Sequence, residues 1–161
     1  MCALIVVVFA YVLQEGWMEL TWSKQMSVGN QTIDTEHKKI FDLVNEVDRV
    51  IGTKDAALIA QALNQLEETT RAHFENEEKI ARAIDFPFED HVLEHKYILD
   101  EFQQIKALLS ANQDSWSESV AEYYFDFLST WAIDHVLEDD MKMKILLETY
   151  PYDFKPDDLA V

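Results

Sequence analysis

The chain has 161 residues, 48% of them hydrophobic and 27% charged, and its formal net charge at pH 7 is −18. This length suits one domain with a sizeable core, and the hydrophobic share excludes a disordered chain. Phosphate binding needs clustered Lys and Arg, so the negative charge argues against a nucleic-acid partner and against an anionic membrane surface. The one cysteine, Cys2, permits no disulfide within the chain, which fits the cytoplasmic location that we expect.

Residues 1–17 form an apolar extension whose first 13 residues, MCALIVVVFAYVL, carry no charged side chain. A stretch this short does not span a bilayer, which takes about 20 residues, and it lacks the basic residues that open a secretory signal. Three interpretations stay open. The true start is Met18, or the extension docks on the domain or mediates assembly as a short helix or strand (Ile5 to Val8), or it is a remnant signal or anchor.

The rest of the chain predicts an arm followed by four helices. The arm, Glu19 to Thr32, has no clear periodicity, and residues 18–155 make up the expected domain. Apolar residues at helical spacing and capping or helix-ending residues define the helices. The first helix is expected from Asp34, as its N-cap, to Ile51, where Gly52 ends it. The second is expected from about Asp55 to Ile84 and is ended by Pro87. The third is expected from Phe88 or Glu89 to Ala111, and the fourth follows a break at Asn112 to Ser115 and runs to about Thr149.

The connections between these helices are short, so neighbouring helices should run antiparallel. Gly and Pro are scarce, with three of each, and this also favours long helices. We therefore predict an all-α, up-down-up-down antiparallel four-helix bundle with an extended N-terminal arm. The acidic segment after Tyr150 is expected to lie on the surface, with residues 156–161 as a tail.

Every predicted helix carries at least one of the five histidines. In HFENE and in HVLEH, the outer residues are four positions apart, which places them on one helix face. A lone helical histidine is usually a surface or satisfied core residue, but five of them on four helices favour a metal site in the bundle. Neutral imidazoles bound to a metal avoid the repulsion of clustered cationic rings. The residues are His37 on the first helix, His73 with Glu77 on the second, His91 and His95 on the third, and His135 on the fourth.

The ligand types narrow the choice of metal. Imidazole and carboxylate without thiolate suit iron, zinc or manganese. Five nitrogen ligands plus carboxylates exceed the four ligands of a tetrahedral zinc. Two metal ions bridged by carboxylates are therefore predicted.

Four segments, SVGNQTIDTEHKK, HFENEE, HVLEH and WAIDHVLEDD, resemble the hemerythrins, in particular the single-domain bacterial ones. The resemblance covers about Leu20 to Tyr150. It implies two iron ions joined by an oxo or hydroxo bridge and held by seven residues. By resemblance, one iron is bound by His91, His95 and His135. The other iron is bound by His37 and His73, and both irons are bridged by the carboxylates of Glu77 and Asp140.

Counted together with the oxygen bridge, these residues give one iron six ligands and the other iron five. One position is therefore left open for dioxygen on the second iron. We therefore expect reversible dioxygen binding for storage, delivery or sensing, in a protein that is not an enzyme. An oxygen-using enzyme would be the partner in delivery, and a monomer is the favoured state.

The step from His135 to Asp140 does not fit an ideal helix, because five residues turn the side chain by about 140°. Asp139, four residues on, would align better, and the acidic run could also be a solvated face. The family pattern nevertheless selects Asp140. We therefore predict either a π-bulge or an axial offset between the two irons.

An apolar pocket is expected beside the open iron position. The resemblance assigns it to Ile40, Phe74, Trp131 and Val136, although ordinary core packing also explains these four residues. Ala132 departs from the family pattern, in which a larger aliphatic residue is usual. We expect this smaller side chain to ease ligand access and to speed autoxidation.

The same residues also fit motifs of other functional classes. HVLEH also fits the H-x-x-E-H pattern of inverted zinc peptidases, with Glu94 as general base, but that reading leaves three histidines unexplained. Ferritin-like di-iron enzymes use Glu-x-x-His pairs, and no Glu here has a His three residues on. A peroxidase, nitric-oxide or oxygen detoxification activity on the hemerythrin scaffold, or a freestanding sensor, stays open as an alternative.

Overall fold

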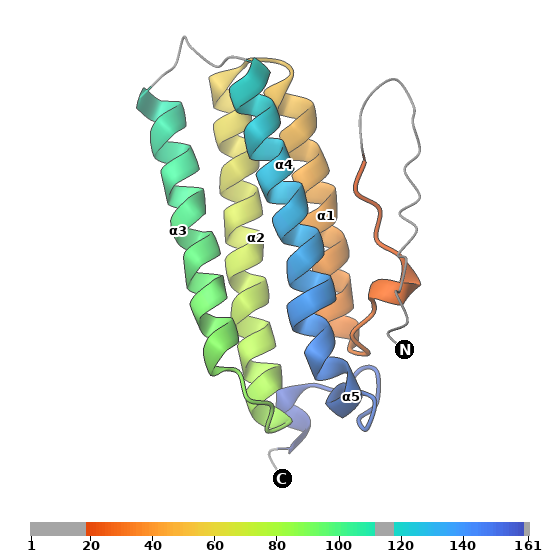
Figure 1. The fold of residues 1–161 in the computed structure, drawn as a ribbon. Helices are drawn as coiled ribbons and strands as arrows, with labels where there is room; N and C mark the ends of the chain where they lie inside the picture. Colours follow the sequence, from red (N-terminus) through yellow and green to blue (C-terminus); the bar gives the residue numbers. More distant parts are fainter. Residues whose placement is uncertain (1–18, 112–117, 160–161) are drawn as a thin grey trace, which may run out of the picture.

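The computed structural model describes residues 19–111 and 118–159. The expected apolar extension, with its ambiguous segment Ile5 to Val8, lies outside the described residues. The described part is helical, without strands, and forms an antiparallel four-helix bundle, which confirms the predicted fold (Figure 1). The bundle helices are α1 (Gln31–Ile51), α2 (Ala56–Ala83), α3 (Glu89–Ala111) and α4 (Glu118–Asp134). Short elements surround them: η1 (Lys24–Met26), the π-helical turn η2 (His135–Asp139), the 3-10 turn η3 (Asp140–Met143), α5 (Lys144–Leu147) and η4 (Pro156–Leu159).

Helix α1 begins earlier than predicted, and the assignment of Asp34 as its N-cap is wrong. The N-cap is Asn30, whose side-chain oxygen accepts hydrogen bonds from the amides of Thr32 and Ile33. Asn and Asp are equally good caps, so composition did not discriminate between the two positions. The arm accordingly ends at Asn30 instead of Thr32.

Asp34 has a different role, in which it joins three parts of the chain. Its carboxylate is fully buried and accepts hydrogen bonds from the Ser27 hydroxyl, from the Val28 amide at 2.9 Å and from the Tyr152 hydroxyl at 3.1 Å. A buried carboxylate is tolerated only when its oxygens are hydrogen-bonded. Asp34 therefore ties the arm and the C-terminal segment to α1.

The segment after Tyr150 lies mostly on the surface, as predicted, but Phe154 is an exception. Phe154 is only 4% exposed and packs in an apolar cluster at this end of the bundle. The backbone is held as well, because the Gln31 amide donates to the Tyr152 carbonyl at 2.7 Å and the Asn30 side chain donates to the Phe154 carbonyl at 3.0 Å.

The end of α1 and both ends of α2 follow the predicted positions closely, whereas the predicted fourth helix is divided, with α4 ending at Asp134 and shorter turns continuing to Leu147. Helix α1 stops at Ile51, but Gly52 keeps right-handed backbone angles, and Lys54 takes the left-handed conformation with φ 58°. Asp55 then caps α2 by accepting from two backbone amides. After α2, Asp85 has φ 54° and lets the chain turn toward α3.

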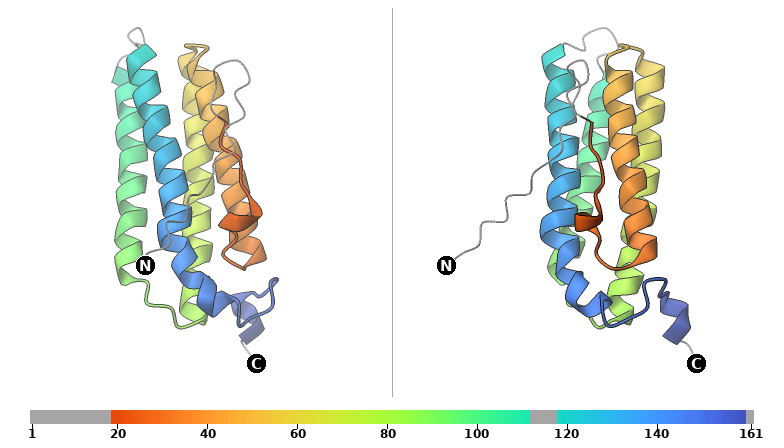
Figure 2. Two further views of the ribbon diagram at one scale, coloured as in Figure 1. Left: turned by 45° about the vertical axis from the view of Figure 1, so that its right-hand side comes forward. Right: turned by 90° about the vertical axis from the view of Figure 1, so that its right-hand side faces the viewer.

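The arm runs in extended form beside α1, on the side where α4 also lies (Figure 2). Both the amide and the carbonyl of Leu20 are hydrogen-bonded to the Asn45 side chain on α1, at 2.8 and 2.9 Å. The Lys38 ammonium lies 4.1 Å from the centre of the Trp22 ring. Across the described residues, no helix is long and apolar enough to cross a membrane.

The core consists of two apolar clusters stacked along the bundle. The larger cluster includes Val44, Leu63 and Phe102, and the smaller one, near the chain end, includes Ile33 and Ile80. On each helix the predicted ligands fall between a residue of one cluster and a residue of the other. The polar site is therefore a layer sealed by apolar side chains on both sides.

Candidate metal centre

The seven predicted ligands lie together in this layer, although they come from four separate parts of the chain. Each is buried, with an exposed fraction of 8% or less. Helices α1, α2 and α3 and the η2–η3 turns present them. They are His37 on α1, His73 and Glu77 on α2, His91 and His95 on α3, His135 in η2 and Asp140 in η3.

Asp140 directs its two oxygens toward different histidines. Its Oδ1 lies 3.2 Å from Nε2 of His91 and 3.2 Å from Nε2 of His135. Its Oδ2 lies 2.8 Å from Nε2 of His37. The first two histidines belong to the predicted set of three and the third to the predicted set of two. Asp140 therefore lies where it could bridge two metal ions held by these histidines.

Glu77 lies close to Asp140 within the same histidine group. Its Oε2 is 3.2 Å from Nε2 of His95, 3.6 Å from that of His91 and 3.9 Å from that of His73. Glu77 therefore also contacts members of both predicted sets. Glu77 belongs to two overlapping groups, in each of which all ligand atoms lie within 4.8 Å of one another. The first group is Glu77, His91, His95 and His135, and the second is His73, Glu77, His135 and Asp140.

The donor atoms of this layer fit a pair of metal ions. In the described part of the chain, the Nε2 atoms of all five histidines and both oxygens of each carboxylate are buried without a well-formed hydrogen bond. Burying so many polar atoms unpaired would be costly, whereas metal ligation satisfies them together. Nitrogen and carboxylate donors without thiolate suit iron. The assignment of each residue to an iron remains a prediction.

The chain reaches Asp140 through a local change of helix type. Residues His135–Asp139 form a π-helical turn, and the Asp140 amide donates to the His135 carbonyl five residues back. The wider turn brings Asp140 onto the His135 face, where it is fully buried. Asp139 is 22% exposed and pairs with Lys142. The π-bulge, one of the two predicted solutions, is therefore confirmed.

Two carboxylates outside the ligand set lie beside histidine rings, and one of them, Glu36, is within hydrogen-bond distance of its histidine. Glu36 lies 3.0 Å from Nδ1 of His73 and accepts from the Asn76 amide at 2.7 Å. Glu94 lies 3.6 Å from Nδ1 of His135. Such partners fix the ring orientation of a metal-binding histidine and raise its basicity. Neither role was foreseen, because the contacts join different helices and no spacing within one helix reports them.

Burial and neighbouring charges together set the protonation of the site. It lowers the pKa of His73 to about 4, and burial together with the neighbouring His135 and His91 lowers the pKa of His95 to about 2. Both rings are therefore neutral at pH 7, as a metal ligand must be. Burial and the nearby Asp140 raise the pKa of Glu77 well above its usual value. Burial opposes ionisation of Asp140 as well, but the surrounding histidines hold its pKa well below the usual range.

The five residues predicted for the apolar pocket are all buried in the larger core cluster. Phe74 stacks on the His95 ring with 3.6 Å between the ring centres. Trp131 lies over the His135 ring, with 5.8 Å between the ring centres. Aromatic rings thus cover two of the histidines. The other members of the pocket are Ile40, Ala132 and Val136.

Comparison with known proteins agrees with this geometry. Residues 28–147 match the family model described as "Hemerythrin HHE cation binding domain". The chain belongs to the hemerythrin family. This hemerythrin is 26% identical over 122 residues to a bacteriohemerythrin of Pseudomonas aeruginosa, covering 75% of this chain and 76% of that protein. It is 28% identical over 126 residues to a hemerythrin-like protein of Naegleria gruberi, covering 78% and 92%.

The solved structures support the fold. A crystal structure of a hemerythrin point mutant superposes with a TM-score of 0.68 at 22% sequence identity, covering 80% of this chain and 96% of that one. Membership of the family implies a non-haem iron site and an oxygen-related function. The buried histidine and carboxylate layer is the part of this hemerythrin that could hold the metal.

Proposed function

We propose that this hemerythrin binds dioxygen reversibly at a non-haem di-iron centre, for storage, delivery or sensing, and that it is not an enzyme. The observation that carries this proposal is the position of Asp140, whose two oxygens lie near histidines of both predicted sets. By the predicted assignment, three histidines would hold one metal ion and two would hold the other, so the two positions would be unequal. The position with fewer ligands is the one proposed to accept dioxygen.

The protein residues have three tasks in this function. When bound, two ferrous ions supply the electrons that reversible dioxygen binding requires. The histidines and the two carboxylates would hold the ions, Glu36 orients His73, and Glu94 lies beside His135. Phe74, whose ring centre lies 5.7 Å from that of His73, belongs to the apolar wall proposed to exclude water and protons from the open side. Such exclusion favours release of unchanged dioxygen over its reduction.

The proposal is tested by visible absorption during oxygen cycling. The iron-loaded protein is reduced without oxygen, exposed to oxygen and then purged with argon, over several cycles. A band that appears with oxygen and disappears on its removal, with constant amplitude, is the expected result. Consumption of oxygen or peroxide with release of product would contradict the carrier and support the peroxidase or detoxification alternative. A His37→Ala variant, which lacks one of the two histidines on the open side, should show no band.

Ala132 offers a test of the apolar pocket. It is buried against the other pocket residues, so Ala132→Leu would add bulk on the side where the ligand is proposed to bind. We expect autoxidation of the oxygenated protein to slow several-fold, because water and protons reach the site less easily. The rate is followed as decay of the visible band. Ala107→Leu makes the same change at an exposed position of α3 and should leave the rate unchanged. An Ala132→Leu protein that folds normally but autoxidises as fast as the parent contradicts the role given to this position.

A further inference from the structure

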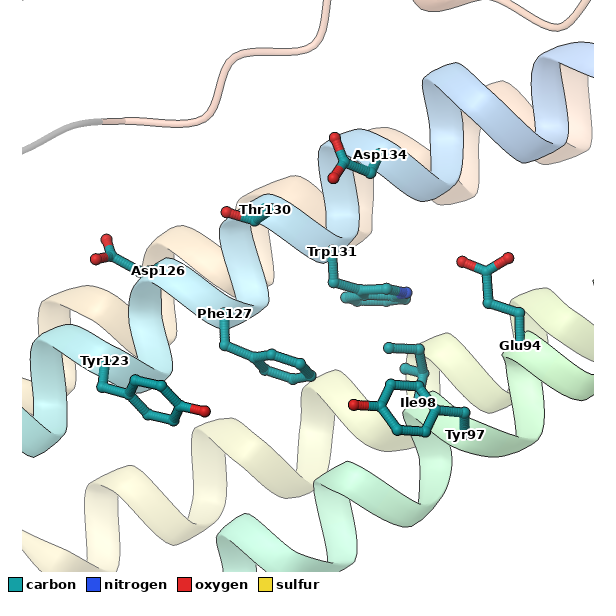
Figure 3. A pocket seen from close by; sticks show the side chains of 9 residues that line it. All are labelled: Glu94, Tyr97, Ile98, Tyr123, Asp126, Phe127, Thr130, Trp131 and Asp134. Carbon is teal, nitrogen blue, oxygen red and sulfur yellow. The ribbon is translucent and has the colours of Figure 1, made fainter.

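A cavity of about 440 Å³ opens between α3 and α4, beside the metal layer but outside the seven predicted ligands (Figure 3). Its volume lies in the range of small-molecule sites. Three lining residues come from α3 and six from α4. They are Glu94, Tyr97 and Ile98, and Tyr123, Asp126, Phe127, Thr130, Trp131 and Asp134.

Aromatic rings dominate the wall of this cavity. Tyr123, Phe127 and Trp131 follow one another at four-residue spacing, so they form one stripe along α4. Tyr97 faces them from α3, and the Tyr97 and Tyr123 hydroxyl groups point toward each other across the opening (Figure 3). Both tyrosines are largely exposed, at 55% and 66%. Their ring faces are therefore accessible to a ligand.

The charges around the rings have one sign. Glu94 lines the cavity from α3, and Asp126 and Asp134 line its α4 side. Within the described part of the chain, no Lys or Arg lines it. A negative potential beside accessible aromatic faces attracts a cation whose charge is spread over methyl groups, as in quaternary ammonium compounds. An anionic ligand is disfavoured by the same charges.

Trp131 adds a specific polar contact. Its indole N–H is buried and has no hydrogen-bond partner among the described residues, and in Figure 3 the indole nitrogen points to the side where Glu94 lies. A hydroxyl group placed there could accept from the indole and donate to the Glu94 carboxylate, which satisfies both. A ligand with a quaternary ammonium group and a hydroxyl therefore matches both ends of the cavity.

We propose that this cavity binds a small quaternary ammonium alcohol of the choline type, with the ammonium group against Tyr97, Tyr123 and Phe127 and the hydroxyl between Trp131 and Glu94. The site borders the metal layer, because Trp131 also lies over His135 and Glu94 lies 3.6 Å from its Nδ1. Bound ligand would thus contact two residues that lie beside a predicted iron ligand. The binding itself does not depend on the proposed oxygen chemistry.

The test is isothermal titration calorimetry of the iron-loaded protein with choline. The matched control ligand is 3,3-dimethylbutan-1-ol, which has the same shape but no charge. Choline should bind at least about tenfold more tightly than this neutral alcohol. Phosphocholine carries the head-group phosphate of a lipid and should bind more weakly than choline because of the surrounding carboxylates. Equal binding of choline and the neutral alcohol, no binding of choline at millimolar concentration, or tighter binding of phosphocholine would overturn the proposal.

Variants distinguish choline binding in this cavity from choline binding elsewhere on the protein surface. Tyr97→Ala and Tyr123→Ala should each weaken choline binding about tenfold, and Asp126→Asn should weaken it to a smaller extent. Leu93→Ala, at an exposed position of α3 outside the cavity, should bind choline as the parent does. Oxygen cycling of the tyrosine variants should remain intact, so failure of choline binding and failure of the oxygen proposal give different results. Unchanged choline affinity in both tyrosine variants would contradict the assigned site.

Discussion

Replacement of Asp140 by alanine is expected to remove most of the bound iron, whereas replacement of Asp139 is expected to leave it in place. Asp140 is fully buried, and its oxygens lie 2.8 to 3.2 Å from the Nε2 atoms of His37, His91 and His135. Its loss would take ligands from both proposed metal positions at once. We expect iron affinity to fall by more than about 100-fold, since even residues that only support a ligand are worth 10- to 100-fold.

The neighbouring aspartate makes this experiment a matched comparison. Asp139 has the same side chain one position earlier but is partly exposed and pairs with Lys142 on the surface. The measurement is iron per chain after dialysis against a weak chelator, for Asp140→Ala, Asp139→Ala and the parent. Circular dichroism confirms that each variant keeps its helices. Iron loss in the Asp139 variant with retention in the Asp140 variant would contradict the role given to the π-helical turn.

Asp34→Ala is expected to lower the free energy of unfolding by about 3 kcal/mol, because three hydrogen bonds to a buried carboxylate would be lost. The Val28 amide, which donates a hydrogen bond to Asp34, would lose this partner. The loss would also loosen the arm and the segment around Tyr152 from α1. Urea unfolding of the protein measures the effect.

The control for this variant is Asp42→Ala, an exposed aspartate on the same helix. It should change the free energy of unfolding by no more than about 0.5 kcal/mol, as is usual for surface substitutions. Similar stability of the two variants would show that Asp34 does not join the arm and the C-terminal segment to the bundle.

Periodicity within one helix was the part of the fold that the sequence revealed best. Helices α2 and α3 end within one or two residues of their predicted limits, because apolar spacing and Pro87 mark them clearly. The π-helical turn was one of the two solutions predicted, since the five-residue step from His135 to Asp140 does not fit an ordinary helix. The structure then brings the seven predicted ligands into one buried layer.

Contacts between distant segments could not be predicted in the same way. Asp34 was read as a cap because Asp is a common capping residue, whereas its actual partners are the arm and Tyr152, 118 positions away. The burial of Phe154 has the same origin, since it depends on a docking surface and not on local pattern. Glu36 lies beside His73 only because α1 and α2 pack together. In each case, tertiary packing decided what local sequence could not.

The most direct test of the proposed function is the ratio of dioxygen taken up to iron present. Reduced, iron-loaded protein is titrated with dissolved oxygen in a closed cell, and the oxygen returned on lowering the partial pressure is measured in the same sample. One dioxygen bound for two irons, and recovered unchanged, is the predicted result, because only one of the two unequal metal positions is proposed to be open. One dioxygen for each iron, or uptake without recovery, would contradict it.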